Sequence, residues 1–449
     1  MNRDGQPAEV RSGLSRALAS FRHRDYLWFW LGALVSNIGT WMQNITVPFV
    51  IYELTRSGAW VGLAAFAGLF PAVVVGPVAG ALADRVERRL LLLWSQVAQT
   101  LLALGLWGAW EAGVRRPAIL ILLVAANGAV FGGTIPAWQA YVSSLVPRDE
   151  LLNAITLNSA QFNGARAIGP AVGGLTLAAF GPSWAFLLNA LSFLAVIAAL
   201  LAIRTRQPAV APRGEGEGGL LSAFADGVRY TRRHSGILLA MVLVGIVSFF
   251  ATPVFQLLPV VARKVFGVGA GLYGVLAGAF GVGAVLGAAL LGVFGDRFDR
   301  SRLVVWSMMV YGGALLALGA APAFALGVLA VLAMGVGFVG VLAVLNTTVQ
   351  LLVAEQLRGR VLAVWSTVLT ALLPLGALAE GALSDAVGMR VVSVGAGLAL
   401  IVTAVVLLAR AQLARSLDEH GHRLIGSDTG AVVEAPGGLA VAPLEGAAS

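Results

Sequence analysis

The sequence contains no cysteine, and its 449 residues include only four histidines. The absence of cysteine excludes disulfides, thiolate chemistry and Cys-ligated metals. The histidines (His23, His234, His420 and His422) all lie in polar stretches, so we expect no metal site inside the fold. No Gly-x-x-x-x-Gly-Lys phosphate-binding loop and no candidate Ser/His/Asp set occurs, so we expect neither ATP-driven work nor an enzyme, and no cofactor.

Charged residues are also scarce. They make up 12% of the sequence, whereas hydrophobic residues make up 58% and the mean hydropathy is +0.86. Ordinary soluble domains contain about 25% charged residues, so this chain has too few to cover a surface that faces water. We therefore expect a lipid bilayer as its solvent, with about 20 apolar residues in each span.

Long apolar runs divide the chain into twelve predicted spans. The sequence predicts an all-α membrane protein with twelve transmembrane helices in two pseudo-symmetric six-helix bundles, because one charged loop occurs at corresponding places in both halves. The predicted segments are 26–52, 59–83, 90–110, 117–143, 151–180, 183–203, 236–261, 270–295, 303–321, 323–350, 361–384 and 391–410.

The two predicted bundles occupy residues 26–203 and 236–410, and the stretches outside them are polar. Residues 1–25 are basic and predict a cytoplasmic amphipathic segment. Residues 204–235 predict a cytoplasmic linker that ends in a surface helix. Residues 411–449 are rich in Gly, Ala and Pro and predict a disordered cytoplasmic tail.

The positions of basic residues predict the topology. One set of alternate loops holds only six of the 30 Lys and Arg, and nearly all the others lie in the opposite loops and the termini. Cytoplasmic loops are enriched in Lys and Arg, so we expect both termini in the cytoplasm of a plasma-membrane protein. This placement also accounts for the net charge of +8 without a nucleic-acid partner. The six are Arg56, Arg115, Arg116, Arg263, Lys264 and Arg390.

A short charged loop follows the second predicted helix and occurs again after the eighth. Each copy begins with glycine, places Asp-Arg four residues later and ends in arginine. The residues that the two copies supply are Gly80, Asp84, Arg85, Arg88 and Arg89, and then Gly292, Asp296, Arg297 and Arg300.

Two motifs resemble those of the major facilitator superfamily of transporters. The loop from Gly80 to Arg89 is similar to the family's signature loop between helices 2 and 3, with Glu87 where the family usually has glycine. The fifth segment is similar to the Gly-Pro-x-x-Gly-Gly motif of the family's antiporters, through Gly164, Gly169, Pro170, Gly173 and Gly174. Over residues 20–410 the pattern most resembles the bacterial exporter branch that includes the enterobactin exporter.

The resemblance implies export of a small organic molecule, such as a drug-like compound, a siderophore or a metabolite, across the cytoplasmic membrane by alternating access. It further implies proton antiport, and we expect a monomer. The two charged loops would act as a gate that holds the cytoplasmic ends together when the cavity opens outward. An importer of the same fold would share nearly every feature, and a membrane scaffold or sensor is a further alternative.

Two charges lie well inside predicted spans. Arg166 lies midway along the fifth segment, where a charge costs about 2.5–3.5 kcal/mol on insertion scales and must face protein or a watery cavity. Glu380, in the eleventh segment, is its expected counter-charge and could carry a proton. We expect this pair to couple substrate to protons. The alternatives are a structural arginine between helices and a Glu380 at the wet interface.

Polar and aromatic side chains recur on one side of several predicted helices. The resemblance places segments 1, 4, 5, 7 and 10 around a cavity. Amides, hydroxyls and aromatics with few charges favour an amphipathic or aromatic ligand, although in a single helix such residues often serve to hold helices together. The candidates are Asn37, Thr40, Gln43, Asn44, Asn127, Thr134, Trp138, Gln139, Tyr141, Asn163, Thr252, Phe255, Gln256, Asn346 and Gln350.

Overall fold

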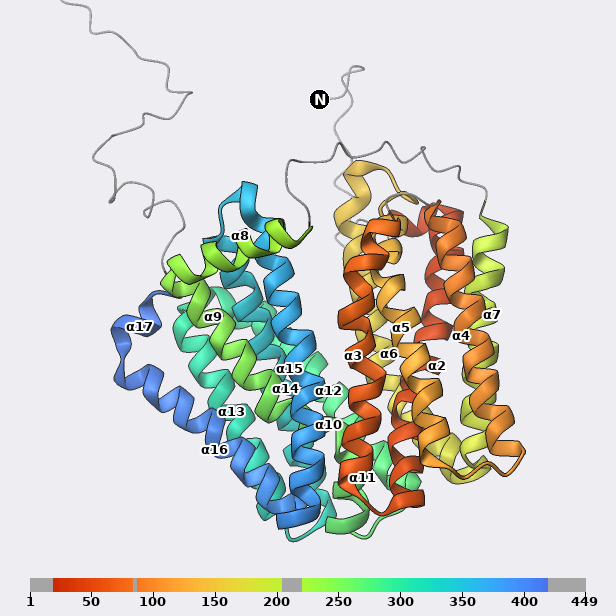
Figure 1. The fold of residues 1–449 in the computed structure, drawn as a ribbon. Helices are drawn as coiled ribbons and strands as arrows, with labels where there is room; N and C mark the ends of the chain where they lie inside the picture. The colour runs from red at the N-terminus through yellow and green to blue at the C-terminus, as the bar shows by residue number, and fades with distance from the viewer. Residues whose placement is uncertain (1–18, 84–86, 204–219, 419–449) are drawn as a thin grey trace, which may run out of the picture.

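The computed structural model describes residues 19–83, 87–203 and 220–418. Within those ranges every regular element is a helix, so the predicted all-α class is confirmed. The helices form two bundles that stand side by side (Figure 1), here called the N-half and the C-half.

The N-half contains six long helices. Proline occupies a first-turn position of the fourth and the sixth, where its missing N–H costs nothing. Gly181, with φ of 81°, lets the chain turn sharply between the fifth and the sixth. The six helices are α2 (Arg24–Thr55), α3 (Gly58–Ala83), α4 (Arg88–Glu111), α5 (Pro117–Val142), α6 (Leu151–Phe180) and α7 (Pro182–Ala202).

The C-half begins with a span that differs from the regular helix predicted for 236–261. After α9 (Ser235–Ile246) the backbone widens into a π-helical stretch, Val247–Ala251, and continues as α10 (Pro253–Gln256), α11 (Leu258–Val260) and a second π-helical stretch, Val261–Val265. The N–H and hydroxyl of Thr252 both bond to the carbonyl of Val247, at 2.9 and 3.1 Å. Pro253 and Pro259 have no N–H to donate, so the regular pattern is interrupted here.

Five long helices complete the C-half. They are α12 (Ala270–Phe294), α13 (Arg300–Ala320), α14 (Phe324–Leu352), α15 (Arg358–Val387) and α16 (Met389–Ala409). With the broken span, residues 19–83, 87–203 and 220–418 contain the predicted twelve segments. Among the described residues, ten helical stretches are long and apolar enough to cross a membrane on composition alone. The other two spans are α2 and α6, which are equally long but carry more polar residues.

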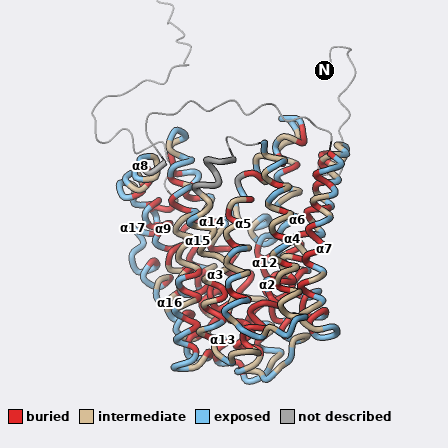
Figure 2. The backbone as a smooth tube through the Cα atoms, turned by 45° about the vertical axis from the view of Figure 1, so that its right-hand side comes forward, coloured by how far each residue is buried: buried red, intermediate tan, exposed pale blue. Residues whose placement is uncertain are grey.

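The halves meet along two helix pairs, α3 with α15 and α6 with α12. Buried and exposed residues alternate along the helices of both halves (Figure 2). Many large apolar side chains are exposed, among them Trp94, Leu122 and Leu175 at 66%, 70% and 67%. Apolar surface of this extent is typical of contact with lipid.

Two short helices flank the C-half in the sequence, one before its first span and one after its last. α8 (Leu220–Arg233) packs on α15 (Figure 1), where the carboxylate of Asp226 pairs with Arg360 at 2.8 Å. α17 (Ala411–Arg415) follows α16, and Asp418 accepts hydrogen bonds from the N–H and hydroxyl of Ser301, at 2.9 and 2.6 Å. Residues 411–418 thus include a short helix, and their last residue is hydrogen-bonded to the start of α13.

Candidate functional site

The larger cavity lies entirely within the N-half and is called the N-half cavity. Its volume is about 410 Å³, and α2, α4, α5, α6 and α7 all contribute to its wall. Six of the residues predicted to line a cavity come together here: Asn37, Thr40, Thr134, Trp138, Gln139 and Asn163.

Sequence reasoning missed the contribution of α4 to this cavity. Gln96 and Gln99 of α4 and Gln161 of α6 are buried and line it. Their signal was present, because two glutamines three residues apart in an apolar segment share one helix face. The family resemblance, however, places segments 1, 4, 5, 7 and 10 around the cavity, and α4 is the third segment.

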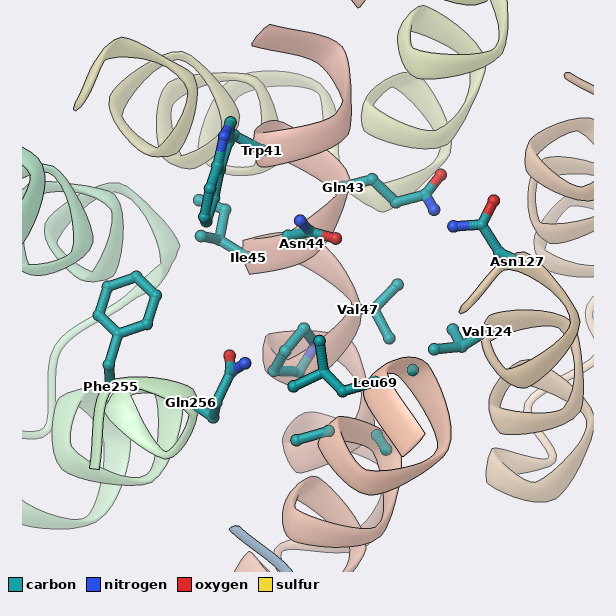
Figure 3. A pocket seen from close by; sticks show the side chains of 14 residues that line it. Trp41, Gln43, Asn44, Ile45, Val47, Leu69, Val124, Asn127, Phe255 and Gln256 are labelled. Atoms are coloured by element: carbon teal, nitrogen blue, oxygen red, sulfur yellow. The ribbon is translucent and has the colours of Figure 1, made fainter. Parts of the chain in front are cut away.

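A second cavity, of about 160 Å³, lies where the two halves meet and is called the interface cavity (Figure 3). Side chains of α2, α3 and α5 line it from the N-half, and α10 lines it from the C-half. One of them is already partnered, because the Oε1 of Gln43 accepts a hydrogen bond of 2.8 Å from the Nδ2 of Asn189. Five predicted residues come together here: Gln43, Asn44, Asn127, Phe255 and Gln256.

The remaining four cavity candidates line neither cavity. Tyr141 is buried against Phe29, with ring centroids 5.2 Å apart. Thr252 bonds to its own helix, as described above. The amides of Asn346 and Gln350 bond to each other at 2.5 Å.

Arg166 lies among aromatic rings supplied by both halves. Its guanidinium carbon lies 5.5 Å from the ring centre of Trp41 in α2, 5.3 Å from that of Phe280 in α12 and 4.8 Å from that of Phe338 in α14. Each distance is within the range of a cation–π interaction. A charge from the N-half is thus held by aromatic rings of the C-half.

Glu380 is 6% exposed, and its Oε2 has no hydrogen-bond partner. The ion pairs found among the described residues do not include Arg166 with Glu380, which differs from the direct counter-charge that the sequence suggested. Tyr311 of α13, which sequence reasoning missed, is buried with its ring 6.3 Å from that of Phe338, one of the rings around Arg166. Arg166 and Glu380 thus form no ion pair with each other among the described residues.

The antiporter-like motif of α6 is a packing surface. A Cβ atom at Gly169 would lie 2.5 Å from the Cβ of Trp41, and one at Gly173 would lie 2.9 Å from the Cα of Met42, so these two glycines face α2. Gly174 faces α12, where a Cβ would lie 3.0 Å from the N of Gly274, whereas Gly164 faces open space. Pro170 lies within the helix and is buried. Glycine lets α6 approach both neighbours closely.

Of the first charged loop, Asp84 and Arg85 lie outside the described residues, and for Gly80, near the end of α3, only the backbone is described. Arg88 and Arg89 begin α4. Arg89 donates from Nε and Nη2 to the carbonyls of Leu200 and Leu201, at 2.8 and 3.2 Å. These are carbonyls at the end of α7, so Arg89 ties two helices of one half together.

The second charged loop is largely exposed. Gly292, Asp296 and Arg297 are exposed and Arg300 is half-buried at the start of α13. The guanidinium of Arg297 lies over the ring of Phe294, 5.2 Å from its centre. The contacts of Arg89 and Arg297 therefore lie within their own halves.

The opposite end of the molecule carries contacts between the halves that the sequence did not indicate. The carboxylate of Asp385, near the end of α15, accepts hydrogen bonds from the Ser57 hydroxyl at 2.5 Å, the Gly58 N–H at 2.7 Å and the Ala59 N–H at 3.0 Å. Asp385 thereby caps the N-terminus of α3 from the other half, where a negative charge is favoured. We call this contact the Asp385 cap.

Further contacts close the same end. Arg263 of the C-half pairs with Glu53 of the N-half, which also pairs with Arg56 at 2.7 Å. Tyr273 stacks on Phe49, with centroids 5.3 Å apart, and donates its hydroxyl to the carbonyl of Ile45 at 3.1 Å. The closed end is the one opposite α8 (Figure 1).

No cluster among the described residues has three or more His, Asp or Glu side chains that could hold a metal ion. This geometry provides a cavity of drug-like size within the N-half, a smaller cavity between the halves, an arginine held by aromatic rings of both halves, and a separate buried glutamate.

Comparisons with known proteins agree with this architecture. The sequence profile of a family described as "Transmembrane secretion effector" matches residues 15–423. The multidrug efflux pump Tap of Mycobacterium tuberculosis is 26% identical over 86% of this chain and 93% of its own length. Macrolide efflux protein A of Streptococcus pyogenes is 23% identical over 80% of this chain and 89% of its own. The crystal structure of the D323A mutant of the nucleoside transporter NupG has a TM-score of 0.72 at 12% identity, covering 86% of this chain and 99% of that one.

Proposed function

Because the chain belongs to the major facilitator superfamily, within its transmembrane secretion effector family, we propose that it exports a small organic molecule by alternating access, with protons moving in the opposite direction. The observation that carries this proposal is a ligand-sized cavity in a two-half bundle that is tied together at one end. The named efflux pumps to which the chain is similar support the outward direction.

Cavity size favours an organic molecule bound in the N-half cavity. Drug-sized ligands occupy pockets of about 300–1,000 Å³, and the N-half cavity, at about 410 Å³, is within that range. The interface cavity, at about 160 Å³, is too small in this conformation. Since it lies where the halves meet, it would change shape when they move.

The closed end supports alternating access. Basic-residue placement predicts cytoplasmic termini, so the end closed by the Asp385 cap would be the outer one, and this conformation would face inward. Outward opening would then break the Asp385 cap and bring the charged loops at the cytoplasmic end together. Asp84 and Arg85, with Arg88 and Arg89, would hold that end, as would Asp296, Arg297 and Arg300 in the second loop.

Arg166 and Glu380 are proposed to couple protons to this movement. Arg166 extends from α6 into aromatic rings of α12 and α14, so any sliding of α6 on α12 moves its charge relative to Glu380. A carboxylate whose electrostatic surroundings change between two conformations binds a proton in one and releases it in the other.

The proposal is tested by flux in proteoliposomes that contain the full-length chain. A panel of organic compounds is first screened for thermal stabilisation of the purified protein, and stabilising compounds are then assayed for transport with and without a pH gradient. Glu380→Gln is expected to abolish flux driven by the gradient while ligand binding survives. The matched control is Glu111→Gln, because Glu111 bonds to Ser183 within one half.

Two results would contradict the proposal. Gradient-driven flux of Glu380→Gln at the parent rate would remove the proton-coupling role. Uptake that proceeds only toward the cytoplasmic side would assign the protein as an importer.

A further inference from the structure

Two amide side chains that line the N-half cavity each have a buried polar atom without a hydrogen-bond partner. Gln96 in α4 is 3% exposed and Gln161 in α6 is 2% exposed. The Oε1 of Gln96 and the Nε2 of Gln161 have no hydrogen-bond partner, and both residues line the cavity.

Two polar neighbours in the same wall differ, because each makes a side-chain hydrogen bond within its own helix. The Thr134 hydroxyl donates to the carbonyl of Val130 at 2.9 Å, and the Asn163 Nδ2 donates to that of Ser159 at 2.9 Å. Unpaired buried polar atoms are therefore not a general property of the side chains in this wall.

An unpaired buried amide lowers the stability of a folded protein. The group loses its hydrogen bonds to water and gains none in return. An apolar side chain of similar shape, such as leucine, would avoid this cost. Residues that break such a rule without a structural gain are found mainly where function requires them.

We propose that Gln96 and Gln161 bind the transported molecule, and that this molecule is uncharged, with a hydrogen-bond donor and acceptor on an aromatic or otherwise apolar body. No Asp, Glu, Lys, Arg or His lines the cavity, whereas Phe131, Trp138 and Phe162 do. A charged ligand would have no counter-ion there. This inference rests on the proposed export function, whose substrate class it names.

In this arrangement, the residues that bind the ligand are different from the residues proposed to couple protons to transport. Every residue that lines the N-half cavity belongs to one half, so the ligand would move with that half. Arg166 and Glu380 are not part of the wall, so equilibrium binding does not require the charge of Glu380.

The test is equilibrium binding to the purified full-length protein in detergent, with two probes. Chloramphenicol is an uncharged aromatic molecule with an amide and two hydroxyls, and tetraphenylphosphonium is an aromatic cation without hydrogen-bonding groups. Chloramphenicol is expected to bind more tightly than tetraphenylphosphonium. Gln96→Leu and Gln161→Leu are each expected to weaken chloramphenicol binding about three- to tenfold, the loss of one hydrogen bond.

A stability measurement makes the test specific. Removal of an unpaired amide is expected to leave the Tm unchanged or to raise it. Gln43→Leu is the matched control, since Gln43 is also buried but bonds to Asn189, and its Tm is expected to fall. Gln96→Met and Gln161→Met serve as second apolar variants if a leucine variant does not fold.

Three outcomes would overturn the inference: tighter binding of tetraphenylphosphonium, unchanged chloramphenicol affinity in both glutamine variants, or a Tm that falls as far as in Gln43→Leu. The same variants distinguish failure of this inference from failure of the proposed function. If both glutamines are needed for binding but no flux occurs in proteoliposomes, only the proposed function is refuted. If flux occurs and is unchanged in Gln96→Leu and Gln161→Leu, only the inference is refuted.

Discussion

Removal of the Asp385 cap is expected to open the end of the molecule that it closes. The carboxylate of Asp385 accepts three hydrogen bonds from the N-terminus of α3, at 2.5, 2.7 and 3.0 Å. Because Asp385 is exposed, solvent screens its charge and only modest values apply. Loss of an N-cap residue costs about 1–2 kcal/mol of stability. About 0.3–1 kcal/mol of this comes from the negative charge at the helix N-terminus.

These values predict a measurable change in population. Asp385→Ala removes both the acceptor and the charge, so about 1–2 kcal/mol should shift the equilibrium toward the open conformation by about five- to thirtyfold. Asp385→Asn keeps one acceptor oxygen and should shift it about two- to fivefold. The effect follows because the cap exists only while the two halves are in contact at this end.

The assay is a distance distribution between two spin labels in nanodiscs. The chain has no cysteine, so Ala112→Cys in the N-half and Ala323→Cys in the C-half, both exposed positions near this end, would carry the only labels. Glu111→Gln is the control, because it removes an acid at this end whose hydrogen bond lies within one half. A long-distance population as small in Asp385→Ala as in the parent would refute the reasoning.

Two further predictions concern stability, and each has a matched control in the same helix. Gly174→Ala should lower the Tm, because its Cβ would clash with Gly274 across the halves at a cost of about 1–3 kcal/mol. Gly164→Ala, in open space, should instead raise the free energy of unfolding by about 0.5–1 kcal/mol. Equal effects of the two substitutions in a thermal melt would argue against close packing of α6 on α12. Arg89→Ala should lower the Tm through lost bonds to the end of α7, at about 1–2 kcal/mol, and a fall in Arg88→Ala of the same size would show that the charge, not the hydrogen bonds, matters.

Periodicity and charge in the sequence were sufficient for the fold class. Long apolar runs indicate spans because lipid requires them, and the repeated loop indicates two similar halves. The broken span after α9 was harder to predict from the sequence. Pro253 and Pro259 signal an interruption, but whether the helix kinks or widens depends on tertiary packing.

The site was only partly predictable, because its partners come from distant parts of the chain. Arg166 was recognisable as a buried charge, yet nothing in its own segment identifies Phe280 and Phe338 as its neighbours. Asp385 has the composition of an ordinary interfacial acid, and its role as a cap depends on where α3 begins in the other half. Gln96 and Gln161 became distinctive only when their missing hydrogen bonds were visible.

The central claim is that the two halves exchange which end of the molecule is closed, and one paired measurement tests it most directly. Spin labels at Ala112→Cys and Ala323→Cys report on the end with the Asp385 cap. Labels at Arg148→Cys and Glu355→Cys report on the other end. Both are exposed positions at the start of short 3-10 helices, one in each half. The account predicts that Asp385→Ala lengthens the first distance and shortens the second. If the first distance lengthens while the second stays unchanged or lengthens too, the halves loosen instead of alternating, and the account is contradicted.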